Sequence, residues 1–133
     1  MKHDQFREVE QMYRSYERIK IKLDLLQPKN VQIFSMTPVY HNAQHSKVEA
    51  MAIERLELEE KIKLIQVCYN IMTRDERLFI EYRYFQGKDI EMVSVLLNWS
   101  RRETFRLRQS VLAKTNWFLS LQSLDRNHTK SAR

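Results

Sequence analysis

A run of arginines in the C-terminal third of the chain carries the side chains best suited to binding chemistry. The segment Ser100-Arg101-Arg102-Glu103 matches a capping box, in which a hydroxyl and a carboxylate satisfy the first free backbone donors of a helix. In the helix that follows, Arg102, Arg106 and Gln109 fall on one face. Arginine can donate two hydrogen bonds to guanine, and glutamine can pair with adenine, so this face suits the reading of base edges in duplex DNA. The residues predicted to contact DNA are Arg101, Arg102, Glu103, Arg106, Gln109, Ser110 and Lys114.

The opposite face of this helix is mostly apolar, as expected for a face that packs on a core. It comprises Thr104, Leu107, Val111, Thr115 and Phe118, flanked by Phe105, Leu112 and Leu119. Arg108 lies near the centre of this face, and breaking a buried ion pair costs about 3–5 kcal/mol. We therefore expect a structural ion pair between Arg108 and either Glu81 or Asp89, with contact to the DNA backbone as the alternative.

Two shorter helices must position the arginine-rich one. Thr73-Arg74-Asp75-Glu76 is a second capping box, and the helix that it opens ends at Gly87, the only glycine in the chain. A helix over residues 89–97 follows, and Asn98-Trp99 forms the next turn. The apolar positions of these two helices are Leu78, Phe79, Tyr82, Phe85, Ile90, Val93, Leu96 and Leu97. Residues 73–121 therefore predict a helix-turn-helix DNA-binding domain, whose third helix is free to enter a major groove. A three-helix bundle with a solvated basic face is the alternative.

These residues also carry a family resemblance. Residues 79–88, FIEYRYFQGK, and residues 100–112, which end in LRQSVL, resemble the helix-turn-helix of sigma-70 region 4. Together with residues 36–62, they make the chain similar to the ArpU/RinA-type phage transcriptional regulators. The resemblance implies binding to double-stranded DNA near promoters, activation of late phage genes and contact with host RNA polymerase. One departure is that Thr104-Phe105 lies one residue later relative to Ser100 than in the family pattern, which shifts the groove-facing residues by up to one position.

Residues 1–72 predict a helical, coiled-coil-like region with an irregular linker at residues 27–45. A first helix, from about His3 to Leu26, has an apolar seam with the spacing of a coiled coil, and Pro28 stops it. The seam comprises Val9, Met12, Tyr16, Ile19, Leu23 and Leu26. A third capping box at Ser46 starts a second long helix that runs to about Met72. The two helices predict either an antiparallel pair within the chain or a homodimer. We favour the homodimer because the linker leaves the first helix free to pair elsewhere.

Composition sets the fold class and the compartment. One glycine and two prolines in 133 residues favour an all-α protein, and residues 122–133 are polar enough to predict a flexible tail. The net charge of +6 is concentrated in residues 73–133, where 12 Lys/Arg face 7 Asp/Glu, and a basic surface attracts nucleic acid. No apolar run is long enough to span a bilayer, no secretory signal is present, and Cys68 is the only cysteine. We therefore expect no membrane partner and a cytoplasmic location. The resemblance to phage regulators implies the bacterial host cytoplasm, in association with the nucleoid.

Catalysis and cofactor binding have little support in the sequence. There is no Gly-rich phosphate loop and no zinc quartet, so we expect neither an enzyme nor a cofactor. His41 and His45 are spaced as zinc ligands on a helix can be, but no cysteine or carboxylate lies nearby to complete a metal site. Two other functions remain alternatives. A small terminase subunit-like DNA packaging adaptor would carry its helix-turn-helix at the N-terminus, and a helical protein–protein adaptor would bind no DNA.

Overall fold

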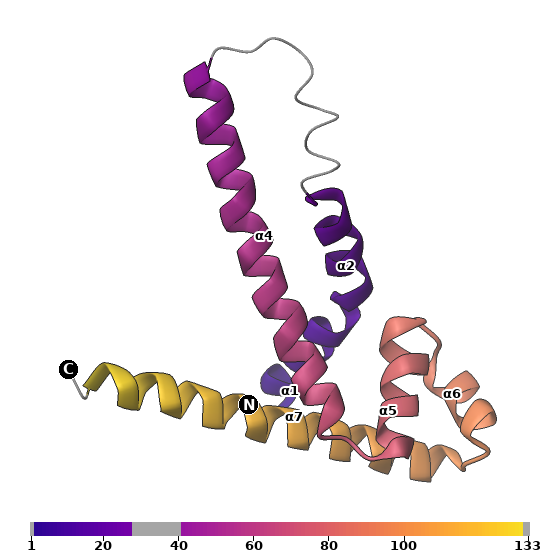
Figure 1. Ribbon diagram of the computed structural model, residues 1–133. Coiled ribbons are helices and arrows are strands. Elements are labelled where there is room, and N and C mark those ends of the chain that lie inside the picture. The colour runs from indigo at the N-terminus through magenta and orange to yellow at the C-terminus, as the bar shows by residue number, and fades with distance from the viewer. Residues whose placement is uncertain (1, 28–40, 132–133) are drawn as a thin grey trace. The chain divides into compact units, whose positions relative to one another are not determined.

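Most of the residues that the structure describes lie in helices. A computed structural model describes the backbone of residues 2–27 and 41–131, and the side chains of residues 6–27 and 46–124 (Figure 1). No strand occurs in these ranges, so the predicted all-α class is confirmed. The elements are α1 (Lys2–Arg14), α2 (Tyr16–Leu25), α4 (His41–Asn70), α5 (Arg74–Ile80), the π-helix η1 (Glu81–Phe85), α6 (Ile90–Leu97) and α7 (Arg101–Ser131).

These helices form two compact units. The first unit comprises Met1–Arg14 and Val67–Arg133, and the second comprises Ser15–Gln66. The sequence had assigned residues 1–72 to one region and residues 73–121 to another. In the structure, by contrast, α1 and the end of α4 belong to the same unit as α5, α6 and α7.

The single N-terminal helix predicted from His3 to Leu26 is wrong. α1 ends at Arg14 and α2 begins at Tyr16, with Ser15 between them. The predicted seam is divided accordingly, because Val9 is buried in the first unit and Ile19 in the second. Tyr13, which lies off the seam, is fully buried as well. The heptad pattern assumed one straight helix with one partner, whereas the two halves of this segment pack in different units.

α4 begins earlier than the sequence predicted. Its first residue is His41, so Ser46 lies inside the helix and does not cap it, and residues 41–45 belong to α4 rather than to a linker. Residues 28–40, the rest of the predicted linker, lie outside the described residues. The residues from His41 to Ser46 contain no glycine or proline, so nothing in the sequence prevents the helix from extending through them.

α5 begins as predicted and ends differently. The Thr73 hydroxyl accepts a hydrogen bond from the Glu76 N–H, and the Glu76 carboxylate accepts one from the Thr73 N–H, which confirms the capping box. The helix then passes into η1, where the Gln86 N–H bonds to the Glu81 carbonyl five residues back. A π-turn shifts the helical phase, and Tyr84 is buried in place of the predicted Tyr82 and Phe85.

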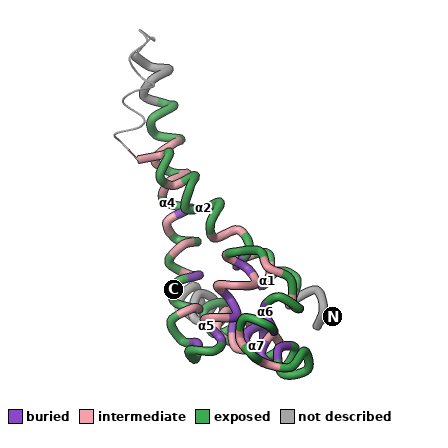
Figure 2. The backbone as a smooth tube through the Cα atoms, turned by 90° about the vertical axis from the view of Figure 1, so that its right-hand side faces the viewer, coloured by how far each residue is buried: buried purple, intermediate pink, exposed green. Residues whose placement is uncertain are grey.

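The core of the first unit lies where α1, α5, α6, η1 and α7 meet. Figure 2 shows the buried residues gathered around α1, α5 and α7. The largest fully buried side chains of this unit are Tyr13, Phe79, Ile80, Leu112, Val9, Val93, Val111, Thr104, Thr115 and Cys68. The Tyr13 ring stacks on that of Tyr84 with centroids 5.6 Å apart, and Phe79 meets Tyr84 edge-on at 5.8 Å. Cys68 is fully buried and is therefore a small core side chain, and this burial raises the pKa of its thiol to about 11.

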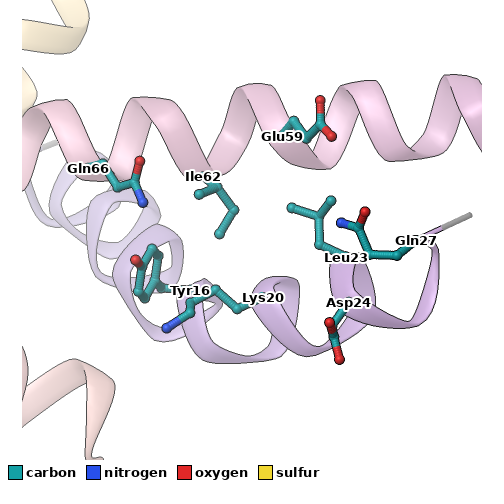
Figure 3. A pocket seen from close by; sticks show the side chains of 8 residues that line it. All are labelled: Tyr16, Lys20, Leu23, Asp24, Gln27, Glu59, Ile62 and Gln66. Carbon is teal, nitrogen blue, oxygen red and sulfur yellow. The ribbon is translucent and has the colours of Figure 1, made fainter. Parts of the chain in front are cut away.

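The second unit pairs α2 with α4 in antiparallel fashion. The Lys22 ammonium lies 2.8 Å from the Glu54 carboxylate, while Ile19 and Leu58 are buried. A shallow groove of about 480 Å³ runs between the two helices, and in Figure 3 Ile62 and Leu23 point into it from opposite sides. The antiparallel pair was one of the two arrangements that the heptad seams predicted.

α7 is longer than predicted. The sequence assigned residues 122–133 to a flexible tail, but the helix continues through Ser131, because residues 121–131 contain no glycine or proline to stop it. Residues 132–133 lie outside the described residues. Within the described ranges, no helix combines the length and apolarity that crossing a membrane requires.

Candidate nucleic-acid interface

The N-terminal half of α7 presents an exposed polar face and a buried apolar one. Arg101, Arg102, Glu103, Arg106, Gln109 and Ser110 are exposed. Thr104, Leu107 and Val111 are buried on the opposite side, as the helical wheel predicted. The helix therefore has a cationic outer face, held at a fixed rotation by its packed inner face.

Three local signals set the two ends of α6 and the start of α7. The Asp89 carboxylate accepts a hydrogen bond from the Met92 N–H and caps α6. Asn98 ends that helix in the left-handed conformation, with φ of 56°, which asparagine tolerates better than most residues. The Ser100 hydroxyl then accepts from the Glu103 N–H at 3.1 Å and caps α7. The caps at Asn98 and Ser100 fix a three-residue connection, residues 98–100, between α6 and the first turn of α7.

Two buried hydroxyls join α6 to α7. Ser94 Oγ donates to Thr104 Oγ1 at 2.9 Å, and Thr104 Oγ1 donates to the Ser100 carbonyl at 2.8 Å. Both side chains are buried, so the hydrogen bonds are shielded from water and hold the two helices in one register. Thr104 was predicted as part of the packed face, and the structure adds its hydrogen-bonding role.

Glu76 connects the start of α5 to the middle of α7. Its carboxylate accepts hydrogen bonds from Lys114 Nζ at 2.7 Å, Ser110 Oγ at 2.6 Å and the Thr73 N–H at 2.8 Å. The side chain is only 3% exposed. Burial alone would raise the pKa of Glu76, but the hydrogen bonds from Lys114, Ser110 and Thr73 outweigh it and lower the pKa to about 2. Ser110 and Lys114, both predicted to contact DNA, are therefore engaged within the protein.

Glu10 on α1 is the partner of Arg108. The Arg108 guanidinium donates to the Glu10 carboxylate at 2.6 Å, and the Tyr84 hydroxyl donates to the same carboxylate at 2.8 Å. Burial would raise the pKa of Glu10, but these two hydrogen bonds outweigh it and lower the pKa. The predicted ion pair exists, but the predicted partners were wrong. Glu81 instead accepts from Tyr69, and Asp89 caps α6.

A second contact fastens α1 to the far part of α7. The Tyr13 and Thr115 hydroxyls are 2.6 Å apart and buried, and the Thr115 hydroxyl also donates to the Val111 carbonyl at 2.8 Å. Burial raises the pKa of Tyr13, so its hydroxyl stays protonated and can serve as the donor to Thr115. Together with the Glu10–Arg108 pair, this contact makes α1 part of the support of α7.

Phe105 was predicted to flank the packed face, but it is 40% exposed. The Arg101 guanidinium lies 5.6 Å from the centre of its ring, within the range of a cation–π contact. The sequence pattern could not show which of the flanking residues the neighbouring helices cover. Phe105 is exposed, whereas Leu112, which was also predicted to flank the packed face, is fully buried.

No metal site competes with this face among the side chains that the structure describes. Among the side chains that the structure describes, no group of three His, Cys, Asp or Glu residues could hold a metal ion. The side chains of His41 and His45 lie outside that part of the chain. What the described geometry offers is a rigidly held cationic helix face.

Comparison with known proteins adds no relative: no protein-family model matches the chain, and neither a curated protein nor a solved structure matches it.

Proposed function

We propose that this chain is a sequence-specific DNA-binding transcriptional regulator of the phage type, in which α6 and α7 act as a helix-turn-helix. The single observation that carries the proposal is the exposed cationic face of α7. Arg102, Arg106 and Gln109 lie together on it, directly after a tightly capped three-residue turn. Such a face can enter a major groove, where arginine reads guanine and glutamine reads adenine.

The support behind α7 strengthens the proposal. A recognition helix must hold its side chains in one orientation, because base contacts depend on hydrogen-bond geometry. Glu76, Glu10 and Tyr13 hold α7 from two other helices. Arg108 is engaged with Glu10, so base reading in our proposal rests on the exposed set: Arg101, Arg102, Arg106 and Gln109, with Glu103 at the edge.

Two partners belong to the proposal as expectations. The resemblance to sigma-70 region 4 implies contact with host RNA polymerase, and a homodimer would place two recognition helices on half-sites one helical turn apart. Sedimentation of the purified protein at high micromolar concentration tests the homodimer directly. A mass of one chain under those conditions would refute it.

Titration of a fluorescent duplex with the protein, at low and at moderate salt, tests the proposed function. The duplex would be selected from a random pool by binding. We expect affinity to fall steeply with salt, because neutralised phosphates release counterions. Arg102→Ala, Arg106→Ala and Gln109→Ala should each weaken binding to the selected site by about 1–3 kcal/mol if they contact bases.

Arg18→Ala is the matched control, because it removes the same charge from an exposed position on the second unit. It should leave both the affinity and the preferred sequence unchanged. Absence of duplex binding at low salt, or recovery of no preferred sequence from the pool, would contradict the proposed function. In the first case a protein–protein adaptor is the better description, and in the second a non-specific packaging adaptor.

A further inference from the structure

One large apolar side chain stands among the exposed cations of α7. Phe105 keeps 40% of its surface exposed, although its neighbour Thr104 and Leu107, two residues further on, are buried. The Arg101 guanidinium is beside its ring at 5.6 Å. Val111 and Leu112, by contrast, are fully buried, so Phe105 offers solvent far more apolar surface than these two core residues do.

The spacing along α7 places Phe105 on the same face as the base-reading side chains. Residues three and four apart are neighbours on a helix, and Arg102, Phe105, Arg106 and Gln109 follow that spacing. Ala113, which is exposed, continues the face and adds almost no bulk, so it leaves room for a close approach. Phe105 is the only large apolar side chain between Arg101 and Gln109 that is exposed on this face.

We propose that Phe105 is a specificity-determining residue that packs on the C5-methyl group of a thymine in the DNA site. This inference rests on the proposed function. The thymine methyl is the one apolar group that a base pair presents in the major groove, and phenylalanine is among the side chains that contact it. Arg102 and Phe105 are separated by about 4.5 Å along the helix axis, roughly one base-pair step. The thymine therefore lies within about two base pairs of a guanine read by Arg102 or Arg106.

Deoxyuridine scanning of the selected duplex tests this contact. Each thymine is replaced in turn by deoxyuridine, which keeps the base pair and lacks only the methyl group. We expect one thymine position at which wild-type affinity falls about fourfold, the value for one buried methylene-sized group. Phe105→Ala should bind the thymine and the deoxyuridine duplexes equally at that position.

Leu121→Ala is the matched control, because Leu121 is on the same helix and 41% exposed, but about 24 Å further along its axis. It should retain the fourfold preference for thymine. The scan on the wild-type protein does not depend on any variant folding. If the wild type binds its site and tolerates deoxyuridine everywhere, or if Phe105→Ala keeps the preference, this inference is overturned while the proposed function stands. If no duplex is bound at all, both are overturned.

Discussion

Replacing Glu76 by glutamine should destabilise the protein at neutral pH and do so in a pH-dependent way. Glu76→Gln keeps the shape of the side chain but removes the charge that Lys114 and Ser110 surround. The pKa of Glu76 is about 2 in the folded protein against an ordinary value of 4.5. Each unit of that difference is equivalent to about 1.36 kcal/mol, so the ionised carboxylate contributes on the order of 3 kcal/mol to the free energy of unfolding.

The sign follows from the depressed pKa. The contribution of Glu76 is fully present above pH 4.5 and is lost as the pH falls towards about 2. Urea unfolding of the wild type and of Glu76→Gln, measured from pH 7 down to pH 2, tests this. The free energies of unfolding of the two proteins should differ by about 3 kcal/mol at neutral pH, and the difference should shrink below pH 4.5.

Asp75→Asn is the matched control, because Asp75 is an exposed acid in the same first turn of α5. It removes the same charge near the helix dipole and should cost only about 0.3–1 kcal/mol. If Glu76→Gln lowers the free energy of unfolding by no more than Asp75→Asn does, the reasoning is refuted. A loss for Glu76→Gln that stays constant down to pH 2 would refute it as well.

Three further substitutions test other contacts of the first unit. Arg108→Ala should lower the free energy of unfolding by about 2 kcal/mol, because it removes the cation nearest to the Glu10 carboxylate and leaves the more distant Arg14 at 3.9 Å. Adding Glu10→Gln should recover part of the loss in urea unfolding. Gly87→Ala should lower the free energy of unfolding by about 1–2 kcal/mol, since Gly87 has φ of 72°, a conformation that alanine resists. No atom lies within 4 Å of an added Cβ, so the cost is conformational and not a steric clash. A melting temperature equal to that of the wild type would contradict this expectation. Tyr13→Phe removes the buried hydrogen bond to Thr115 and should cost about 1 kcal/mol in calorimetry, whereas an unchanged stability would show that the bond contributes nothing.

Features that depend on neighbouring residues were predictable from the sequence. The caps at Thr73 and Ser100 and the left-handed Gly87 follow from residue type and short-range spacing, and the structure confirms each of them. The packed face of α7 was also predictable, because its regular helical spacing continues through Thr115. These signals act within a few residues, where propensity and capping dominate.

Features that depend on distant residues were not predictable. Glu10 lies 98 positions from Arg108, and nothing local marks it as the partner rather than Glu81. The π-turn at η1 moved Tyr84 into the core, because a wheel of constant period cannot represent one inserted residue. Phe105 was predicted to flank the packed face of α7 but is 40% exposed, because the wheel gives an angle and not the position of the neighbouring helices.

The contacts of α1 with α7 also determine the order in which this protein can fold. Glu10 and Arg108 are 98 positions apart, and Tyr13 and Thr115 are 102 apart, so both contacts close a loop that spans most of the chain. Closing such a loop costs about 4 kcal/mol in chain entropy, so we expect helices that are close in sequence to form before α1 docks. At a synthesis rate of about 5–20 residues per second, α1 leaves the peptidyl transferase centre roughly 5–20 s before its partners on α7 exist. During that interval the partners of Glu10 and Tyr13 on α7 are missing, and the first unit can complete its folding only after α7 has been made.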